Sequence, residues 1–161
     1  LVALQQAGAW RPAIKLSENP QKTPTPGRKQ AWRLIDKRGL AVADVLSLAD
    51  EAPGQATSLR LHHPTDISRQ RTINPDTYHF EPLLETVLEP GHRVQPPADL
   101  ATLRARRVQD IGQLDPGVQR LINPHVYHVS LTEGLWQLKQ ELIAELRTGT
   151  SAAQTPSEPQ S

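Results

Sequence analysis

A loop rich in cations and hydroxyls is the part of this sequence best suited to chemistry. It spans residues 14–30 and is interrupted by three prolines and a glycine. Its cations are Lys15, Lys22, Arg28 and Lys29, and its hydroxyls belong to Ser17, Thr23 and Thr25. Cations bind phosphate through charge-assisted hydrogen bonds, and prolines and glycine keep the backbone irregular, with N–H groups free for an anion. The loop therefore predicts phosphate binding, although its composition alone favours a solvated turn.

Two histidine pairs and one arginine cluster are weaker candidates for a site. His62-His63 and His125-x-x-His128 suggest a metal site, but no carboxylate at ligand spacing accompanies either pair. Zinc normally takes three or four protein ligands, so we expect structural roles for these histidines. Three arginines within residues 104–107 lie on a predicted amphipathic helix, where charges usually mark the solvated face. We assign them no function.

Length and composition predict one modest domain or a part of a larger one. The chain has 161 residues, is 37% hydrophobic and contains one Phe, two Tyr and three Trp, so its core must be aliphatic. Cysteine is absent, which excludes disulfides and a cysteine nucleophile within these residues. A net charge of +1 argues against nucleic-acid binding driven by bulk charge.

Hydropathy predicts the cellular location of the chain, and the first residues indicate whether it is part of a longer protein. The longest apolar runs are far shorter than the roughly 20 residues of a membrane span, so we expect a soluble, cytoplasmic protein. Methionine is absent, even at position 1, and the chain opens on the strand-like sequence LVAL. These features predict a piece of a longer protein.

Extended structure is expected through residue 88. The strongest pattern is a hairpin, because residues 30–35 alternate, residues 36–39 carry turn chemistry, and residues 40–48 are apolar. The other expected segments are a strand at residues 1–4, a connector at 5–12, an extended piece at 13–16, a strand at 58–62, a polar loop, and a strand at 78–88 that Pro82 interrupts and the Pro90-Gly91 turn closes.

Helical periodicity begins after residue 97. Leu100, Leu103, Ile111 and Leu114 have the spacing of a first helix, and Asp115 is placed to cap a second, short one that carries Val118, Leu121 and Ile122 inward. A last helix is predicted from a capping box at residues 130–133 and a leucine stripe, with Gly149 just past its end. The stripe comprises Leu131, Leu135, Leu138, Leu142 and Leu146.

An ordered series of motifs resembles one enzyme family. The cationic loop and the strand after it are similar to a segment of bacterial nicotinate phosphoribosyltransferases that lies beside the phosphoribosyl diphosphate site. The matching residues are Lys15, Ser17, Lys22, Pro26, Gly27, Lys29, Arg33 and Asp36. The segments ADVLSLADE, LHHPTD and RLINPHVYHVSLTEGLWQLKQELI then follow in the family order. The chain thus resembles a C-terminal fragment of this family.

The resemblance implies an α+β fragment. It comprises the end of an α/β barrel related to quinolinate phosphoribosyltransferase, followed by a β-hairpin-rich piece and C-terminal helices. We expect residues 1–29 to form the end of the barrel region with the phosphate loop, residues 30–147 a C-terminal α+β domain, and residues 148–161 a disordered tail.

The resemblance also implies an activity. The family is an ATP-coupled ligase of NAD salvage that forms nicotinate mononucleotide and diphosphate from nicotinate and phosphoribosyl diphosphate, with Mg²⁺ accompanying the phosphates. We expect the catalytic histidine upstream of Leu1, Lys15, Ser17, Lys22 and Arg28 at the substrate phosphates, and a homodimer. Cations near departing diphosphate would stabilise its negative charge. The alternative is a non-catalytic α+β interaction module, because these residues contain no complete catalytic set.

Overall fold

A computed structural model describes the backbone of residues 3–6 and 9–152 and the side chains of residues 12–148. The strands are β1 (Ala3–Gln6), β2 (Ala9–Pro12), β3 (Lys29–Ile35), β4 (Ala41–Leu48), β5 (Leu59–His62), β6 (Gln70–Ile73), β7 (His79–Pro82), β8 (Leu88–Glu89), β9 (His92–Arg93) and β10 (His128–Thr132). The α-helices are α1 (Leu100–Gly112) and α2 (Glu133–Ala152), and the short 3₁₀ helices are η1 (Pro20–Lys22), η2 (Pro53–Gln55) and η3 (Pro75–Thr77).

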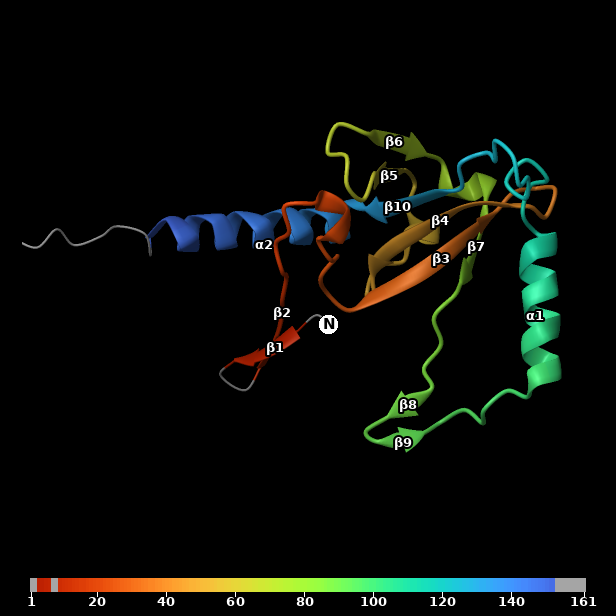
Figure 1. Cartoon of the computed structure of the whole chain (residues 1–161), viewed down its shortest axis with the longest axis horizontal. Helices are drawn as coiled ribbons and strands as arrows, with labels where there is room; N and C mark the ends of the chain where they lie inside the picture. Colours follow the sequence, from red (N-terminus) through yellow and green to blue (C-terminus); the bar gives the residue numbers. More distant parts are fainter. Residues whose placement is uncertain (1–2, 7–8, 153–161) are drawn as a thin grey trace, which may run out of the picture.

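A six-stranded mixed sheet organises the chain, in the order β6-β5-β10-β4-β3-β7. Every neighbouring pair is antiparallel except β10 and β4, which run parallel. The predicted hairpin is present as β3 and β4, with Asp36 accepting hydrogen bonds from the backbone N–H groups of Arg38 and Leu40. Gly39 completes this turn with a φ of 80°. Figure 1 shows the sheet with α2 projecting beyond it on one side.

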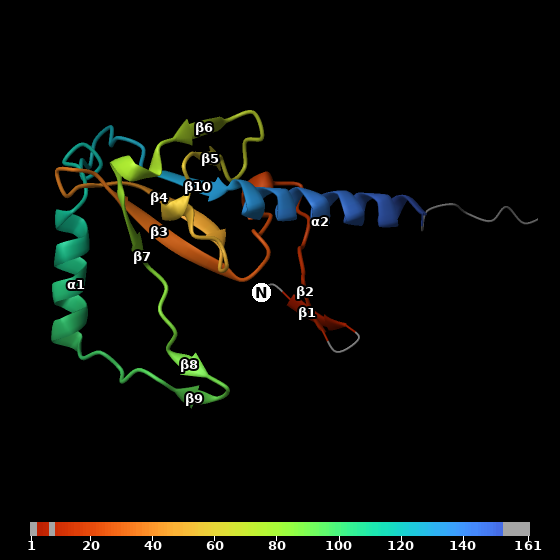
Figure 2. The same ribbon diagram turned by 180° about the vertical axis from the view of Figure 1, so that it is seen from behind.

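The two faces of the sheet are covered by different elements. One face carries the cluster Leu34, Val45, Leu59 and Leu61, against which Tyr78 and other partly buried residues pack. Side chains alternate between faces along a strand, so His62 points to the opposite face, where it stacks on Trp136 of α2. Figure 2 shows α2 starting at the end of β10 and running outward beyond the sheet. The sheet is therefore packed on both sides.

The predicted capping box at the start of the last helix is wrong. Ser130, Leu131 and Thr132 belong to β10, which pairs with β4 on one side and β5 on the other. The strand satisfies its backbone groups through these neighbours, and Leu131 is fully buried. Helix α2 begins only at Glu133, whose carboxylate bonds to His62.

Helix α2 extends further than predicted. It passes through Gly149, which we expected beyond its end, and continues to Ala152, so the first residues of the expected tail are helical. Leu135 is fully buried, whereas Leu146 is 41% exposed, because the helix leaves the sheet along its length. Residues 153–161 of the expected tail lie outside the described residues.

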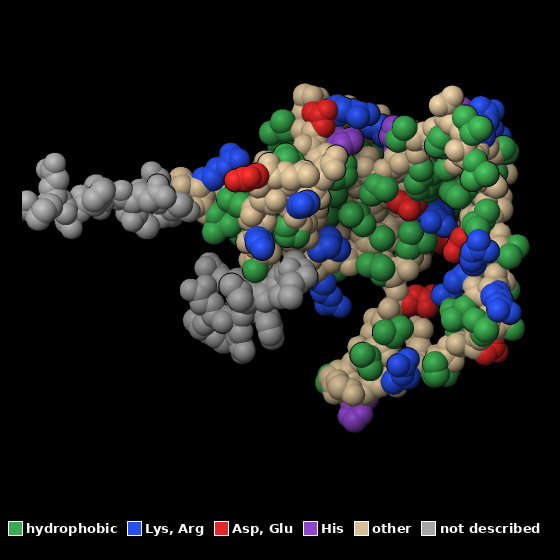
Figure 3. Space-filling model, in the orientation of Figure 1, with side chains coloured by type: hydrophobic (Ala, Val, Ile, Leu, Met, Phe, Trp, Pro, Cys, Tyr) green, Lys and Arg blue, Asp and Glu red, His purple; other side chains and the backbone are tan. Residues whose placement is uncertain are grey.

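The segment that contains β8, β9 and α1, called the arm below, leaves the sheet after β7. The strand predicted over residues 78–88 is instead two strands, β7 and β8, because the chain turns away from β3 after Leu83, whose N–H donates to the carbonyl of Ala31. The β8–β9 turn at Gly91 and helix α1 follow, and Asp99 caps α1 through the N–H of Thr102. Figure 3 shows the arm standing apart from the main body, with apolar side chains on its surface.

The short helix expected after Asp115 is also wrong. The Asp115 carboxylate accepts the N–H of Gly117, and the N–H of His125 donates to the carbonyl of Gly117, so the chain doubles back in a turn. A Cβ at Gly117 would clash with the His125 ring in this arrangement. Leu121 is 99% exposed, and Ile122 is similarly exposed rather than turned inward.

Three further segments differ from expectation, two near the chain start and one in the polar loop. Part of the connector expected at residues 5–12 is strand β2, which pairs with β1. Residues 1–2, at the start of the strand expected over residues 1–4, lie outside the described residues. The polar loop contains β6, an edge strand whose residues are mostly exposed and therefore lack an apolar alternation. Residues 13–16 belong to no strand.

Gly27 and Gly39 provide a matched test of backbone strain and packing. Both have positive φ values, of 89° and 80°. A Cβ on Gly27 would lie 3.0 Å from Leu138 and 3.1 Å from Leu48, whereas one on Gly39 would meet nothing within 4 Å. We predict that Gly39→Ala lowers the free energy of unfolding by about 1 kcal/mol through strain alone. Gly27→Ala should cost about 2–4 kcal/mol, because crowding is added.

Urea denaturation of the full-length protein measures both losses. Equal losses for the two variants would show that contact with Leu48 and Leu138 contributes nothing.

Candidate functional site

The cationic loop connects β2 to β3 and contains the 3₁₀ helix η1. Asn19 caps η1 by accepting the N–H of Gln21 at 2.9 Å, and the N–H of Thr23 closes its other end on the carbonyl of Pro20. Prolines and a side-chain cap thus hold the loop in a fixed, non-repetitive form.

The end of the loop is anchored beneath α2. Pro26 and Gly27 are buried, and Gly27 lies against Leu48 and Leu138. The Lys29 ammonium donates to the carbonyls of Thr25 and Gly27 at 2.9 and 2.7 Å, and burial lowers the pKa of Lys29. Lys29 is therefore committed to closing the loop on itself.

The predicted phosphate ligands lie on the outside of this loop. Lys15, Lys22 and Arg28 are exposed. Among the described residues, the side chains of Lys15 and Lys22 form no hydrogen bond or ion pair. The hydroxyl of Ser17 accepts the N–H of Asn19 at 3.3 Å, so it helps to shape the loop. Two of the cations are thus available to an anion.

Arg28 lines a different environment from that of the two lysines. It borders a hollow of about 450 Å³ with Leu48, Asp50 and Leu138 among its other lining residues. A carboxylate in the same hollow opposes binding of an anion there. Of the predicted ligands, Arg28 therefore has the least favourable surroundings for phosphate.

A second hollow joins the loop to the helix and to the β5–β6 turn. Pro20 and Thr23 line it together with His63, Trp136 and Lys139, and its volume is about 120 Å³. Lys139 is 5% exposed, and its ammonium donates to the carbonyl of Pro64 at 2.9 Å. Burial lowers the pKa of Lys139. This lysine fastens α2 to the turn after β5.

His62 forms a polar contact that the sequence did not indicate. Its Nε2 lies 2.7 Å from the carboxylate of Glu133, and its ring stacks on Trp136 with centroids 4.4 Å apart. The hydrogen bond with His62 lowers the pKa of Glu133, opposed by partial desolvation and helped by Arg60, which lies 3.9 Å away. These contacts join β5 to the first turn of α2. The spacing of residues 62, 133 and 136 carries no signal for them.

A neighbouring carboxylate completes this junction. Glu51 accepts the hydroxyl of Thr132 at 2.6 Å and the N–H of Leu48 at 2.7 Å. It therefore ties the end of β4 to the end of β10.

A second polar cluster lies at the other end of the sheet. Asp44 accepts the Tyr127 hydroxyl at 2.8 Å and the Arg33 Nε at 3.3 Å, and Arg33 also reaches Asp110 of α1 at 3.6 Å. Burial is the main cause that raises the pKa of Tyr127, with the hydrogen bond to Asp44 second. The tyrosine of the Asn-Pro-His-x-Tyr segment thus holds the approach to β10 against the hairpin.

The histidine pairs form no metal centre within the part of the chain that the structure describes. No group of three His, Cys, Asp or Glu residues there is placed to hold an ion. His62 and His125 have the structural roles described above.

The cationic loop, the hairpin and the segment around Tyr127 can now be compared with known proteins. A family model described as "Nicotinate phosphoribosyltransferase C-terminal domain" matches residues 28–139. The chain belongs to this family. The family resemblance expected from the sequence is therefore confirmed, and it favours the enzyme over the interaction module.

Named relatives support the same family. Nicotinate phosphoribosyltransferase from Bos taurus is 38% identical over 134 residues, which cover 83% of this chain and 24% of the relative. The enzyme from Bacillus subtilis is 27% identical over 92% of this chain and 30% of its own length. The chain thus spans about a quarter of the length of the mammalian relatives.

The fold matches a family member as well. The crystal structure of human nicotinic acid phosphoribosyltransferase aligns with a TM-score of 0.63 and 34% identity, covering 74% of this chain and 23% of that chain. The architecture of a mixed sheet with two α-helices is the α+β fold expected from the sequence.

The comparisons bear unequally on the predicted ligands. The range matched by the family model begins at Arg28, so Lys15, Ser17 and Lys22 lie before it.

No helix within the described residues is long and apolar enough to cross a membrane.

The contact between His62 and Glu133 predicts a pH dependence of stability. The pKa of Glu133 lies below its usual 4.5 in the folded protein. A carboxyl with a lowered pKa stabilises the fold above its unfolded pKa and loses that contribution as pH falls through the folded pKa. We predict that Glu133→Gln destabilises the protein near neutral pH, and that the difference from wild type shrinks as pH falls below 4.5.

Thermal unfolding of the full-length protein across this pH range measures the difference. Glu141→Gln is the matched control, because Glu141 is an exposed glutamate on the same helix. A difference between wild type and Glu133→Gln that does not change with pH would contradict the assignment.

Proposed function

We propose that this chain is the C-terminal part of a nicotinate phosphoribosyltransferase. The match of the family model to residues 28–139 carries the proposal. The full-length enzyme would join nicotinate to phosphoribosyl diphosphate and release nicotinate mononucleotide and diphosphate in NAD salvage, with ATP hydrolysed in the process. Its catalytic histidine would lie outside this chain.

The contribution of this chain would be electrostatic. Departure of diphosphate concentrates negative charge on its oxygens, and fixed cations nearby lower the barrier. Lys15 and Lys22 suit this task because both are exposed and their ammonium groups are not committed to described residues. Ser17 would orient the loop or donate to a phosphate oxygen, and Arg28 would add charge at its edge. Lys29 is excluded, because it closes the loop from within.

Mg²⁺ and ATP enter this proposal as companions of the phosphates. Mg²⁺ prefers carboxylate and phosphate oxygens, and the loop offers cations and hydroxyls instead. No suitable group of carboxylates or histidines occurs among the described residues. We therefore propose that Mg²⁺ arrives bound to the substrate phosphates and is not held by this part of the chain.

The arm supports the view that this chain works inside a larger body. Leu100, Leu103 and Val108 of α1 are 62%, 49% and 67% exposed, and Leu88 of the β8–β9 hairpin is 58% exposed. Exposed apolar surface of this kind marks an interface. We propose that the remainder of the full-length enzyme covers the arm, with residues 1–29 forming the end of its barrel region. A homodimer, in which the loop reaches a neighbouring active site, and a cytoplasmic location complete the proposal.

An activity assay tests the function directly. The full-length protein is supplied with nicotinate, phosphoribosyl diphosphate, Mg²⁺ and ATP, and nicotinate mononucleotide is measured by chromatography. We predict product from nicotinate, increased by ATP, and little from nicotinamide. Product from nicotinamide alone would overturn the substrate, and no product from either base in a folded protein would favour the interaction module.

The loop assignment has its own test. We predict that Lys15→Ala and Lys22→Ala each lower kcat/KM for phosphoribosyl diphosphate by about tenfold, because each removes a charge-assisted hydrogen bond to phosphate. Lys37→Ala is the matched control, since Lys37 is an exposed lysine in the β3–β4 turn. Unchanged kinetics in both loop variants would remove the assignment and leave the family membership intact.

A further inference from the structure

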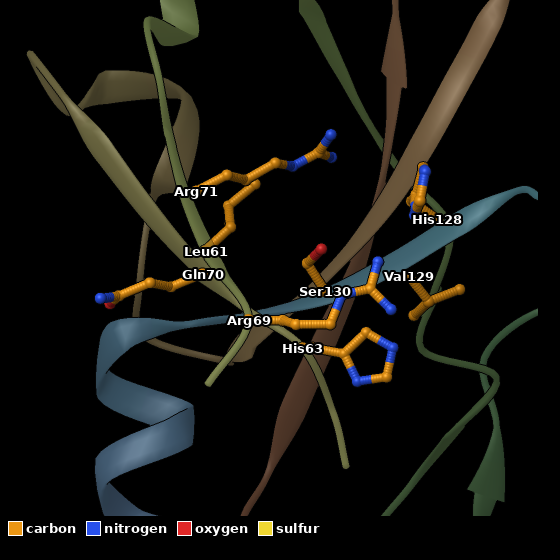
Figure 4. A pocket seen from close by; sticks show the side chains of 8 residues that line it. All are labelled: Leu61, His63, Arg69, Gln70, Arg71, His128, Val129 and Ser130. Atoms are coloured by element: carbon orange, nitrogen blue, oxygen red, sulfur yellow. The ribbon is translucent and has the colours of Figure 1, made fainter. Parts of the chain in front are cut away.

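A cationic hollow lies on the sheet face opposite α2. Its volume is about 250 Å³, and it is lined by residues of β5, β6, β10 and the turn between β5 and β6. Leu61 and Ser130 belong to this face, because their neighbours His62 and Leu131 point toward the other. Figure 4 shows Leu61, Arg69 and Arg71 on one side of the hollow and Ser130 and His128 on the other, while Gln70 and Val129 point away from it. It is distinct from the cationic loop.

Two guanidinium groups supply its charge. Arg69 and Arg71 stand two residues apart at the edge strand, and Arg71 lies opposite Leu61 in the β5–β6 ladder. Among the described residues, neither arginine forms a salt bridge. The nearby Asp66 is bonded to Ser68, which is the main cause of its lowered pKa, and the charge of Arg69 adds a smaller effect. No carboxylate lines the hollow itself.

Ser130 places a hydroxyl at the base of the same hollow. The residue is only 8% exposed, and its side chain forms no hydrogen bond to any described residue. Among the described residues, every fully buried side-chain N or O atom has a hydrogen-bond partner. The unpaired Ser130 hydroxyl is therefore accessible to solvent. The hydroxyl is not committed to another side chain, so it can donate to an acceptor that enters the hollow.

His63 contributes a donor whose direction is fixed. Its Nδ1 accepts the backbone N–H groups of Thr65 and Asp66 at 3.3 and 3.0 Å. A backbone N–H can only donate, so the ring proton of the neutral imidazole lies on Nε2. Figure 4 shows this ring beside the Arg69 side chain. The hollow therefore combines two guanidinium groups, a hydroxyl and an imidazole N–H.

We propose that this hollow binds a phosphate group. Phosphate presents several strong acceptor oxygens and a double negative charge, which match the donors and the charge of the lining. The ligand is either free inorganic phosphate or the phosphate of a phosphorylated metabolite. The site is separate from Lys15 and Lys22 and goes beyond the proposed function, which does not require it.

Equilibrium dialysis of the full-length protein against ³²P-labelled inorganic phosphate tests the proposal. We expect the double variant Arg69→Gln/Arg71→Gln to bind one phosphate fewer per subunit than wild type, or to bind it at least about tenfold more weakly. Ser130→Ala should weaken the same site several-fold and leaves the surface charge unchanged. Arg93→Gln is the matched control, because Arg93 is an exposed arginine of β9 outside the hollow.

Circular dichroism and thermal unfolding establish that each variant is folded before binding is compared. Displacement of the labelled phosphate by phosphoribosyl diphosphate would identify a phosphorylated metabolite as the occupant, and its retention would identify free phosphate. Identical stoichiometry and affinity in wild type, the double variant and Ser130→Ala would overturn the proposal. The kinetics of the Lys15 and Lys22 variants are independent of this result.

Discussion

The pairing of β10 with both β4 and β5 is the constraint on which the rest of the structure depends. This strand lies far along the chain from its two neighbours, yet it joins the β6-β5 pair to the β4-β3-β7 group in one sheet. Helix α2 follows it without a linker, so the register of β10 also sets where the first turns of α2 pack against the sheet. Ser130 and Leu131, on opposite faces of this one strand, help to build the cationic hollow and the helix interface.

Polar groups reinforce this arrangement at both ends of the strand. The Glu51 and Glu133 carboxylates bind Thr132 and His62 where β10 becomes α2, and Asp44 binds Tyr127 where the chain approaches β10. Partly buried charges need such partners, because leaving one unpaired is costly. These carboxylates are therefore structural, and the same holds for Lys29, which the loop uses for its own closure.

Two kinds of exposed surface stand out among the described residues. The arm presents exposed apolar side chains, and the chain spans about a quarter of the length of its mammalian relatives. The cationic loop and the hollow between β5, β6 and β10 present hydrogen-bond donors, and both suit anions. Their chemistry is similar, but the loop is an exposed turn, whereas the hollow contains a nearly buried hydroxyl.

The sequence by itself determined the features that depend on neighbouring residues and on motif order. The β3–β4 hairpin follows from alternation and turn chemistry, α1 follows from helical periodicity, and the family follows from linked motifs. For the candidate site, the sequence identified the exposed lysines but not the contacts of His62 or the hollow around Ser130. Only the tertiary structure decided that residues 130–132 form a strand, that residues 70–73 pair at an edge, and that Gly117 turns the chain back. Each of these depends on partners distant in sequence, and local pattern contains no information about which distant strand supplies the hydrogen bonds.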